Sequence, residues 1–468
     1  MKKNDSVEVT IEDIGMNGEG IGKVNGYTLF IKDAIIGDVV EVKVMKAKKQ
    51  YGYAKMLRIV KVSPYRIEAR CEVARTCGGC QIQEMSYEKQ LEFKQLKVRN
   101  HLMRIGGFAE EGLQVIEEPI VGMDYPFAYR NKAQFPIGRN ASGKAIAGFY
   151  AGHTHRIIPN TDCALGVAVN QPILECILSF VDEYQISVYD EKSHMGLLRH
   201  VMIRYGFRTD EIMVCLIVNG TKLPYAEELV KRLQQFEGMT SITLNSNTEK
   251  SNVIMGDKMI TLWGQEYITD KLGDISYQIS PLSFYQVNPA QTEKLYQLVM
   301  EYADLQGKEN VWDLYCGIGT ISLFLASKAK QVHGVEIIPQ AIENAKENAH
   351  INHIENATFY VGKAEEVLPR MYEKKQISAD VIVVDPPRKG CEESLLETIV
   401  KVQPEKVVYV SCDSATLTRD LRYLCDRGYQ LQRYRTCDCF GQTVHTETVV
   451  LLSKLKSKKS TGLENGNE

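Results

Sequence analysis

Two residues suited to covalent chemistry stand near the C-terminus of this 468-residue chain. Cys412 follows the apolar run KVVYVS, and Glu447 opens the apolar run ETVVLL. A cysteine at the exit of a strand that opens a helix can act as a nucleophile, because the helix N-terminus lowers the pKa of its thiol. A carboxylate at the same edge can act as the base. A cysteine kept only for packing would suit the strand interior instead, so the pattern predicts catalysis by Cys412 and Glu447.

A second group of residues suits an adenosyl ligand. Gly317-x-Gly319 lets the backbone pass close to a ligand, and Glu336 ends the next apolar run, where an acidic residue binds ribose hydroxyls. Ser322 replaces the third glycine of the dinucleotide fingerprint, which favours S-adenosyl-L-methionine over NAD. Asp385 begins an Asp-Pro-Pro turn that the two prolines make rigid. This turn is typical of methyltransferases that act on planar bases.

The residue after the two prolines indicates which kind of atom on the base is methylated. Arg388 stands where enzymes that methylate an amino-bearing base carry a stacking aromatic residue. Thiolate addition to C6 of uracil would instead activate C5 toward a sulfonium methyl group, and a base must then remove the C5 proton. We therefore predict methylation of uracil C5 in RNA. Two alternatives stay open: an RNA amine methyltransferase with a structural Cys412, and a non-catalytic RNA-binding assembly factor.

Three cysteines within ten residues, Cys71, Cys77 and Cys80, suit a metal centre. Thiolates at this density bind zinc or an iron–sulfur cluster, and Gly78-Gly79 lets the backbone turn its amides toward the sulfur atoms. Zinc sites usually show two CxxC pairs, and this segment has one pair and a single cysteine. Cys163, in the turn-rich NTDCALG, is the best candidate for a fourth ligand. Redox-active thiols are one alternative to a metal centre, and a redox sensor built on the cluster is an alternative to a methyltransferase.

Repeated βα units must position the catalytic residues. Apolar runs at 310–316, 331–337, 357–362, 379–385 and 406–411 predict strands, each followed by a helical pattern, and 429–440 and 446–455 predict a final strand pair. This alternation predicts a doubly wound, Rossmann-like parallel sheet with ligands at the carboxyl ends of its strands. Asn288 and Pro289 predict the start of a helix. We assign residues 279–455 to this domain and 456–468 to a disordered tail.

The first two thirds of the chain predict two further domains, so the whole is a multidomain α/β protein. Residues 1–62 have short alternating strands and the Asn25-Gly26 hairpin signal, which predict an OB-like β-barrel. Residues 63–278 predict a central α+β domain that carries the cysteines, with a helix over 84–105.

Basic residues mark both domains as candidates for RNA contact. The segment from Lys43 to Arg66 has no Asp or Glu between its cations, a local electrostatic footprint on a chain of net charge −3. In the central strands, the following residues could track phosphates from one sheet face: Arg130, Lys132, Arg139, His153, His155, Arg156, Arg199, His200 and Arg204.

The composition excludes several classes of protein. With 44% hydrophobic and 25% charged residues, the chain is neither disordered nor a membrane protein. The N-terminus lacks the apolar core of a signal peptide. We therefore expect a cytoplasmic protein whose twelve cysteines stay reduced.

The last domain resembles the uracil-5 RNA methyltransferases in FYQVN, DLYCGIGT, VEI, VDPPRKG, SCDSATLTRD and HTET. The first resembles the TRAM domain, an RNA-binding barrel, in its glycine run, its Ile36-Gly37-Asp38 turn and its basic third quarter. With the four cysteines, the resemblance spans nearly the whole chain. It is closest to the 23S ribosomal RNA (uracil-5-)-methyltransferases, since the transfer RNA members generally lack both the barrel and the cluster.

The resemblance implies specific roles for ten residues. It implies a [4Fe–4S] cluster on Cys71, Cys77, Cys80 and Cys163, S-adenosyl-L-methionine contacts from Gln286, Tyr315, Glu336 and Asp385, and Cys412 and Glu447 as nucleophile and base. It implies ribosomal RNA as partner and no protein partner. The chain departs from the family pattern at Thr320, at Asp413-Ser414 and in CFGQT, which affects loop shape.

Overall fold

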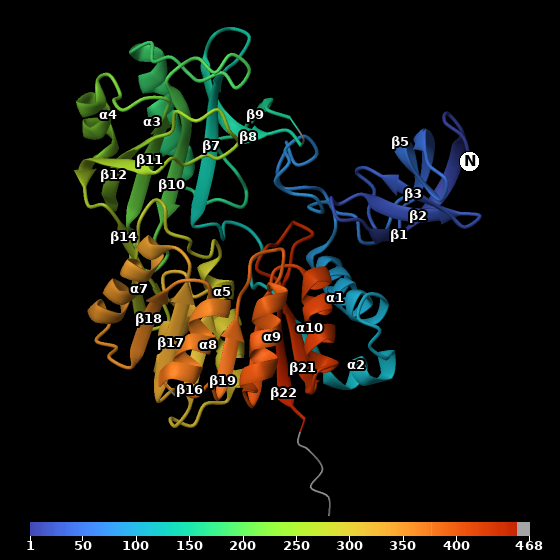
Figure 1. The fold of residues 1–468 in the computed structure, drawn as a ribbon. Helices are drawn as coiled ribbons and strands as arrows, with labels where there is room; N and C mark the ends of the chain where they lie inside the picture. The colour runs from blue at the N-terminus through green and yellow to red at the C-terminus, as the bar shows by residue number, and fades with distance from the viewer. Residues whose placement is uncertain (153, 376, 456–468) are drawn as a thin grey trace, which may run out of the picture.

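The structure is a computed structural model that describes residues 1–152, 154–375 and 377–455. His153 and the predicted tail, 456–468, lie outside the described residues. Figure 1 shows a small barrel at the upper right, a mixed sheet with helices at the upper left, and a larger α/β domain below both. Among the described residues, no helix combines the length and the apolar character that a membrane span requires.

The N-terminal barrel closes because five short strands alternate buried and exposed side chains. The strand order is β1-β2-β3-β5-β4, and Val9, Leu29 and Val42 are among the residues that fill its core. Asn25 and Gly26 both have positive φ, so the predicted hairpin turn is confirmed. The strands are β1 (Ser6–Ile14), β2 (Gly20–Val24), β3 (Tyr27–Ile31), β4 (Val39–Ala47) and β5 (Tyr51–Lys61).

The basic run of the barrel divides into a surface part and a structural part. The side chain of Arg66 is only 10% exposed, and its guanidinium bonds the carboxylates of Asp38 and Glu84. Asp38, which is fully buried, also accepts the backbone N–H groups of Ile35 and Ser63. Arg66 therefore joins the barrel to the next segment, and the expectation that it contributes to the RNA footprint was wrong.

The central domain is a seven-stranded mixed sheet in the order β13-β12-β11-β10-β7-β8-β9. Its core includes Phe135, Phe180 and Val201, with α3 and α4 packed against the sheet. The elements are β7 (Lys132–Arg139), β8 (Ala145–Tyr150), β9 (Ile157–Pro159), α3 (Asn170–Glu183), β10 (Leu198–Tyr205), β11 (Ile212–Val218), α4 (Ala226–Leu233), β12 (Met239–Ser246) and β13 (Lys258–Gly264). A separate pair follows, β14 (Ile268–Leu272) and β15 (Ile275–Ile279).

Three of the basic residues expected to track phosphates are instead buried in β10. Arg199, His200 and Arg204 are each no more than 3% exposed, because β10 lies between β7 and β11 with both faces covered. Arg199 donates to the carbonyl oxygens of Asn247 and Glu249. Arg204 likewise donates to the carbonyl oxygen of Ser283. Burial lowers the pKa of His200 to about 4, so its imidazole carries no charge at pH 7. None of the three side chains is placed to bind phosphates, and the expectation was wrong for them.

The C-terminal domain is an eight-stranded sheet in the order β18-β17-β16-β19-β20-β22-β21-β6. Strands β16 to β20 run parallel, and β22 is antiparallel to β20. Helices α5, α6 and α7 cover one face and α8, α9 and α10 the other, as doubly wound sheets require. The strands are β16 (Asn310–Leu314), β17 (Gln331–Glu336), β18 (Ala357–Val361), β19 (Val381–Val384), β20 (Lys406–Ser411), β21 (Tyr429–Cys437) and β22 (Glu447–Lys454). The helices are α5 (Pro289–Ala303), α6 (Thr320–Ala326), α7 (Pro339–Ile351), α8 (Ala364–Lys375), α9 (Glu393–Val402) and α10 (Ser414–Cys425).

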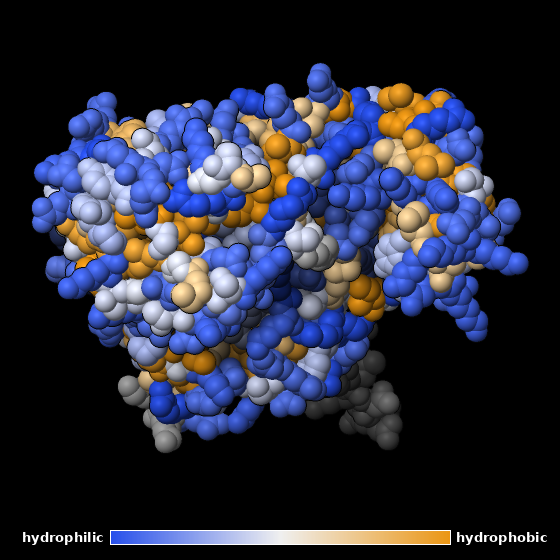
Figure 2. All heavy atoms as spheres, turned by 90° about the horizontal axis from the view of Figure 1, so that it is seen from above, coloured by the Kyte–Doolittle hydropathy of each residue, from blue (hydrophilic) through white to orange (hydrophobic). Residues whose placement is uncertain are grey.

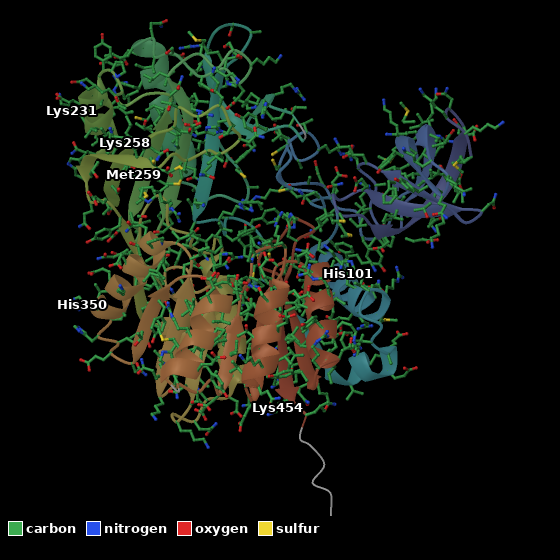
Figure 3. All side chains as sticks on the ribbon, in the orientation of Figure 1. His101, Lys231, Lys258, Met259, His350 and Lys454 are labelled. Atoms are coloured by element: carbon green, nitrogen blue, oxygen red, sulfur yellow. The ribbon has the colours of Figure 1, made fainter. Side chains whose placement is uncertain are left out.

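Segments that precede the central domain complete this sheet. β6 (Glu117–Val121) pairs with β21 at the sheet edge. α1 (Tyr87–Arg104) packs against α10, and His101 Nδ1 lies 2.8 Å from Ser414 Oγ. Figure 3 labels His101 on this side of the domain. The shorter α2 (Glu110–Ile116) follows α1. The predicted boundary at residue 278 stays a prediction, but part of the range 63–278 clearly belongs to the catalytic sheet.

Candidate active site

A cleft of about 1570 Å³ opens at the carboxyl ends of the parallel strands. It spans the switch point between β16 and β19, from which the chain winds in opposite directions. Gly78 and Gly79 of the cysteine segment and Asp257 of the central domain also contribute to its wall. The six residues predicted for cofactor binding and catalysis all line it: Gln286, Tyr315, Glu336, Asp385, Cys412 and Glu447.

Strand register brings Cys412 and Glu447 together. β20 and β22 are antiparallel, and Ser411 pairs with Thr448. The next residue outward on β20 is Cys412, and the next residue outward on β22 is Glu447. Residues opposite each other in such a pair have side chains within contact range. The thiol and the carboxyl group therefore face the same end of the cleft.

The pKa of Cys412 differs from the sequence expectation. Burial is the main cause, and together with the charges of Glu447 and Asp385 it raises the pKa of Cys412 to about 12. Asp413 caps α10 by accepting the N–H groups of Ala415 and Thr416, so the first amides of this helix are already satisfied. The expectation of a lowered pKa was wrong, because burial and the two nearby carboxyl groups outweigh the helix terminus.

The carboxyl groups beside the thiol are also shifted toward their protonated forms. Burial raises the pKa of Asp385 to about 7 and that of Glu447 well above its usual value. The Arg388 guanidinium, at the exposed rim, partly offsets the rise in the pKa of both Cys412 and Glu447. Burial lowers the pKa of nearby His445 to about 4, so its imidazole is neutral at pH 7. A cationic ligand in this cleft would favour the ionised thiol and carboxyl groups.

The adenosyl side of the cleft is formed by the turn after β16. Glu336 accepts the N–H of Gly317 at 3.3 Å and that of Ile338 at 3.0 Å, which holds its carboxylate at the cleft. Tyr315 has a φ of +72° and Gly319 a φ of +82°. A Cβ at Gly319 would lie 3.2 Å from the Phe359 ring, so glycine is required for the close approach.

Asp313 is a site residue that the sequence analysis missed. It is the one acidic residue in the apolar run 310–316, and burial raises its pKa to about 7. Its Oδ2 accepts the Ser322 hydroxyl, and its Oδ1 lacks a partner within the described ranges although the residue lines the cleft. An unpartnered buried acceptor fits a ligand that donates hydrogen bonds, such as the amino group of S-adenosyl-L-methionine.

The segment before α5 forms another wall of the cleft. Asn288 caps α5 by accepting the N–H of Gln291, which confirms the predicted helix start. The backbone oxygen of Gln286 accepts the Asn131 amide at 3.0 Å, and its side chain lines the cleft. The buried Arg204 guanidinium bonds the carbonyl oxygen of Ser283. The central domain therefore fixes the backbone that presents Gln286.

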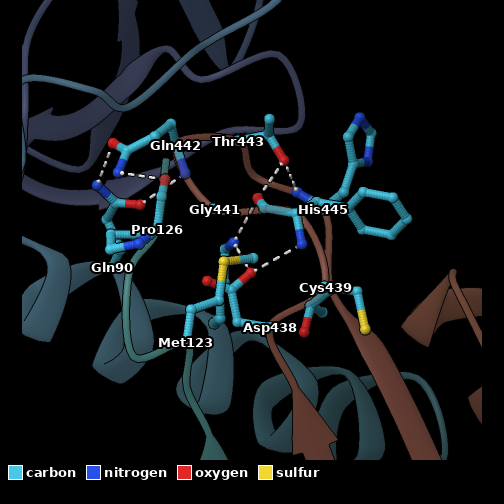
Figure 4. A network of polar contacts seen from close by, with 12 residues as sticks. Gln90, Met123, Pro126, Asp438, Cys439, Gly441, Gln442, Thr443 and His445 are labelled. Atoms are coloured by element: carbon cyan, nitrogen blue, oxygen red, sulfur yellow. Dashed lines mark hydrogen bonds and ion pairs between the residues drawn. The ribbon is translucent and has the colours of Figure 1, made fainter. Parts of the chain in front are cut away.

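The loop that carries Glu447 is held by a buried polar network (Figure 4). Lys94 Nζ of α1 lies 2.6 Å from Asp438 Oδ1 and donates to the Phe440 carbonyl oxygen at 3.0 Å, and both charged side chains are fully buried. Gln90 and Gln442 exchange two hydrogen bonds, at 2.9 and 3.0 Å. The loop 438–446 is thereby fixed on α1, which sets where β22 and Glu447 begin.

Substitution Lys94→Met should destabilise the fold strongly. Removal of one partner from a fully buried ion pair leaves the Asp438 carboxylate uncompensated, at a cost of about 3–5 kcal/mol in unfolding free energy. The double variant Lys94→Met/Asp438→Asn should lose less, because the remaining amide is neutral and still accepts hydrogen bonds. Urea unfolding measures both variants.

A surface pair supplies the control for this prediction. Lys346 and Glu343 form an ion pair with side chains 52% and 63% exposed, so Lys346→Met should change the unfolding free energy by no more than about 0.5 kcal/mol. Equal losses from Lys94→Met and Lys346→Met would contradict a structural role for the buried pair.

The four cysteines predicted as cluster ligands lie in one neighbourhood. Burial, together with the charges of Cys163 and Cys77, raises the pKa of Cys80 to about 12. Burial, with smaller contributions from Cys163 and Cys71, likewise raises the pKa of Cys77. The Gly79 N–H donates to Cys77 Sγ at 3.4 Å. All four are half-buried free thiols. In the part of the chain that the structure describes, no three His, Cys, Asp or Glu side chains are arranged closely enough to hold a single metal ion.

Comparisons with known families decide the identity of this cleft. A family model described as tRNA (Uracil-5-)-methyltransferase matches residues 209–455, more than half of the chain. The chain belongs to the RNA (uracil-5-)-methyltransferase family. A TRAM domain model matches residues 2–57 of this methyltransferase, which identifies the barrel. S-adenosyl-L-methionine is therefore the methyl donor, and RNA is the substrate.

Relatives align with this methyltransferase along its whole length. An uncharacterized RNA methyltransferase of Clostridium tetani is 47% identical over 98% of both chains. Another, from Halalkalibacterium halodurans, is 49% identical over 97% of this chain and 98% of its own. The crystal structure of Pyrococcus abyssi tRNA (uracil-54, C5)-methyltransferase, in complex with S-adenosyl-L-homocysteine, superposes with a TM-score of 0.76 at 29% identity. The superposition covers 95% of this chain and 100% of that one.

Proposed function

We propose that this enzyme methylates C5 of a uridine in 23S ribosomal RNA, with Cys412 as nucleophile and Glu447 as base. The observation that carries the proposal is the pairing of β20 with β22, which sets both side chains at one end of the cleft. An amine methyltransferase needs no thiol there, and an RNA-binding factor needs neither residue. We also assign the protein to the cytoplasm, where ribosomal RNA is modified in bacteria.

The proposed reaction divides into three steps. The Cys412 thiol loses its proton to solvent, and Sγ adds to C6 of the uracil, which turns the C5=C6 bond into an enolate. When bound, S-adenosyl-L-methionine supplies an electrophilic methyl group, which C5 takes while the sulfur leaves as the thioether of S-adenosyl-L-homocysteine. Glu447 then removes the C5 proton, the C5=C6 bond re-forms and Sγ leaves C6 as thiolate. Arg388 favours the ionised state of both groups before the first step.

The cofactor contacts follow the geometry of the cleft. We assign Glu336 to the ribose hydroxyls, because two backbone amides hold its carboxylate at the end of β17. Tyr315, Gln286 and Asp385 supply the remaining predicted contacts from the cleft wall. Asp313 joins them through its unpartnered oxygen.

A transfer RNA is the second candidate substrate. The archaeal neighbour, named as a tRNA (uracil-54, C5)-methyltransferase, shares the architecture over 95% of this chain, so the presence of the barrel does not by itself favour ribosomal RNA. Purified 23S ribosomal RNA and bulk transfer RNA, both from cells that lack this enzyme, should be compared as acceptors of a labelled methyl group. Incorporation into 23S ribosomal RNA alone supports the proposal, and incorporation into transfer RNA alone replaces it.

We further propose that Cys71, Cys77, Cys80 and Cys163 hold a [4Fe–4S] cluster. The donor set fits, because four reduced thiols share one neighbourhood and a backbone amide already points at sulfur. Each thiolate of such a cluster binds a different iron, so the sulfur atoms stand farther apart than ligands of a single ion. The bound group would join the 71–80 segment to the loop before α3.

Substitution Cys163→Ser should remove iron from the purified protein and reduce its solubility, because three thiolates would have to hold the cluster alone. Iron analysis and visible absorption measure the first effect, and the soluble fraction after expression measures the second. Cys176→Ser is the control, since Cys176 is also half-buried but packs against the central core. A soluble Cys163→Ser protein with full iron content would contradict the assignment.

A further inference from the structure

Three aromatic side chains form a continuous surface on the outside of the barrel. Phe30, Tyr51 and Tyr53, called the aromatic face below, project from β3 and β5, where Phe30 pairs in register with Tyr53. The ring centroids of Phe30 are 5.9 Å from those of Tyr51 and 5.5 Å from those of Tyr53. Tyr51 and Tyr53 are 40% and 43% exposed. The rings therefore support one another and still present their surfaces to solvent.

The aromatic face is held rigidly by the β4–β5 hairpin. The Tyr27 hydroxyl lies 2.5 Å from the Tyr51 carbonyl oxygen and 2.9 Å from that of Lys48. A Cβ at Gly52, between the two tyrosines, would lie 2.9 Å from the Lys46 carbonyl oxygen. The hairpin backbone thus fits closely around a glycine, and a ligand that binds Tyr51 and Tyr53 need not order them first.

Charge is segregated around the barrel. The exposed side of β1 carries Glu8 and Glu12, on a strand that pairs with β2 and β4 but not with β3 or β5. Figure 2 shows the barrel lobe, at the right, with apolar side chains set among hydrophilic ones. Lysines lie on the strands next to the aromatic face, where Lys46 pairs with Tyr53, and in the turn between β4 and β5. They are exposed and form no ion pair with a described residue: Lys23, Lys43, Lys46, Lys48, Lys49 and Lys55. The unpaired lysines can bind a polyanion, and the exposed rings can stack on planar groups that the same polyanion carries.

We propose that the aromatic face stacks unpaired bases of the RNA substrate while the surrounding lysines bind its phosphates. Barrels of this type bind single strands by such a combination of stacking and charge. The bases of a duplex are already stacked on one another, so the ligand is a single-stranded segment. The inference rests on the proposed function for RNA as substrate, and it assigns a surface and a binding mode outside the catalytic cleft.

The double variant Tyr51→Leu/Tyr53→Leu tests stacking without removing apolar surface. The full-length protein is titrated with an oligouridylate of about ten nucleotides, and separately with an abasic strand of the same length. We expect the variant to bind oligouridylate between about 5-fold and 150-fold more weakly than wild type, the range for loss of one stacked base. Binding of the abasic strand should be the same for both proteins.

Two control variants separate stacking from charge and from general damage. Lys46→Ala/Lys49→Ala should weaken both strands and reduce the slope of log affinity against log salt by about 0.7 for each lysine that contacts a phosphate. Tyr372→Leu changes a tyrosine of similar exposure, 38%, on α8 and should bind like wild type. Thermal unfolding of each variant confirms that the fold is kept.

The outcomes distinguish this proposal from the proposed function. Binding is measured without methyl transfer, so a failure to methylate any RNA would leave the stacking result intact. Equal affinity of Tyr51→Leu/Tyr53→Leu and wild type for oligouridylate would overturn the proposal and leave the aromatic face as a contact for protein. Equal loss of affinity for the abasic strand would also overturn it, since stacking requires bases.

Discussion

Cys412→Ala is expected to abolish methylation, with a fall in rate on the order of 10⁴-fold or more. The loss should be this large because C5 of uracil is a poor nucleophile until sulfur adds to C6. The Cys412 thiol lies at the end of β20 beside Glu447. Among the described residues of the cleft wall, the one other cysteine is Cys316, which is only 4% exposed and cannot replace it. Single-turnover methyl transfer to 23S ribosomal RNA measures the effect.

The binding of S-adenosyl-L-methionine should survive this substitution, because the proposed cofactor contacts come from other strands. Cys425→Ala, at the end of α10, changes another half-buried cysteine and should keep full activity. Methylation by Cys412→Ala at a rate near that of wild type would contradict covalent catalysis and favour the amine methyltransferase.

The raised pKa of Cys412 gives this prediction a pH dependence. A thiol with a pKa of about 12 is almost entirely protonated at pH 7, and its reactive thiolate fraction grows tenfold with each pH unit. The value of kcat/KM for RNA should therefore rise with pH through the neutral range. A profile that is flat between pH 6 and pH 9 would show that the thiol is already ionised in the free enzyme.

Glu447→Gln is expected to trap the enzyme on its RNA. The amide cannot accept the C5 proton, so methyl transfer should proceed while release of the product slows by about 10²- to 10⁴-fold. The methylated uridine would then remain bonded to Cys412 Sγ. A band of protein–RNA adduct that resists denaturing electrophoresis, and that carries label from the methyl group, measures the effect.

The adduct itself supplies the control. Cys412→Ala/Glu447→Gln lacks the thiol and should form no adduct, whereas Cys425→Ala/Glu447→Gln should form as much as Glu447→Gln alone. Free methylated RNA without adduct from Glu447→Gln would show that another group removes the C5 proton. The neutral His445 imidazole, in the same cleft, would then be the first residue to substitute.

Patterns among neighbouring residues predicted the strands, turns and helix starts. They could not predict which strands pair when the partners are far apart in the sequence. Alternation in the barrel strands, the Asn25-Gly26 turn and the Asn288 cap depend on neighbours in sequence, and the structure contains all of them. β6 pairs with β21, more than 300 residues later in the chain. The sequence of β6 carries no mark of that partner, so its place in the catalytic sheet could not be predicted.

In the candidate site too, features set by local sequence could be predicted and features set by long-range contacts could not. Chemistry-bearing residues at strand ends were predictable, because parallel strands bring their carboxyl ends to one edge, and all six cofactor and catalytic candidates line the cleft. The direction of the Cys412 pKa shift could not be predicted, since it depends on burial in the folded cleft and on carboxyl groups from two other strands. Asp313 was missed because an acidic residue inside an apolar run gives no sign of an unpartnered oxygen. The buried Lys94–Asp438 pair likewise joins segments far apart in sequence.

The cleft draws its walls from three parts of the chain. Gly78 and Gly79 of the cysteine segment line it together with Cys412, and Gln81 N–H donates to the carbonyl oxygen of Gln442 at 3.1 Å. The segment that we assign to the cluster is thus bonded directly to the loop before Glu447. A group held by the four cysteines would therefore help to fix this wall of the cleft and the loop before Glu447.

Release of tritium from 5-tritiated uridine in unmodified 23S ribosomal RNA, with S-adenosyl-L-methionine present, tests the central claim most directly. We predict release by wild type in proportion to methyl incorporation, and no release by Cys412→Ala. Methyl incorporation without release of tritium would contradict the account, because it would place the methyl group on an amine or a ribose instead of C5.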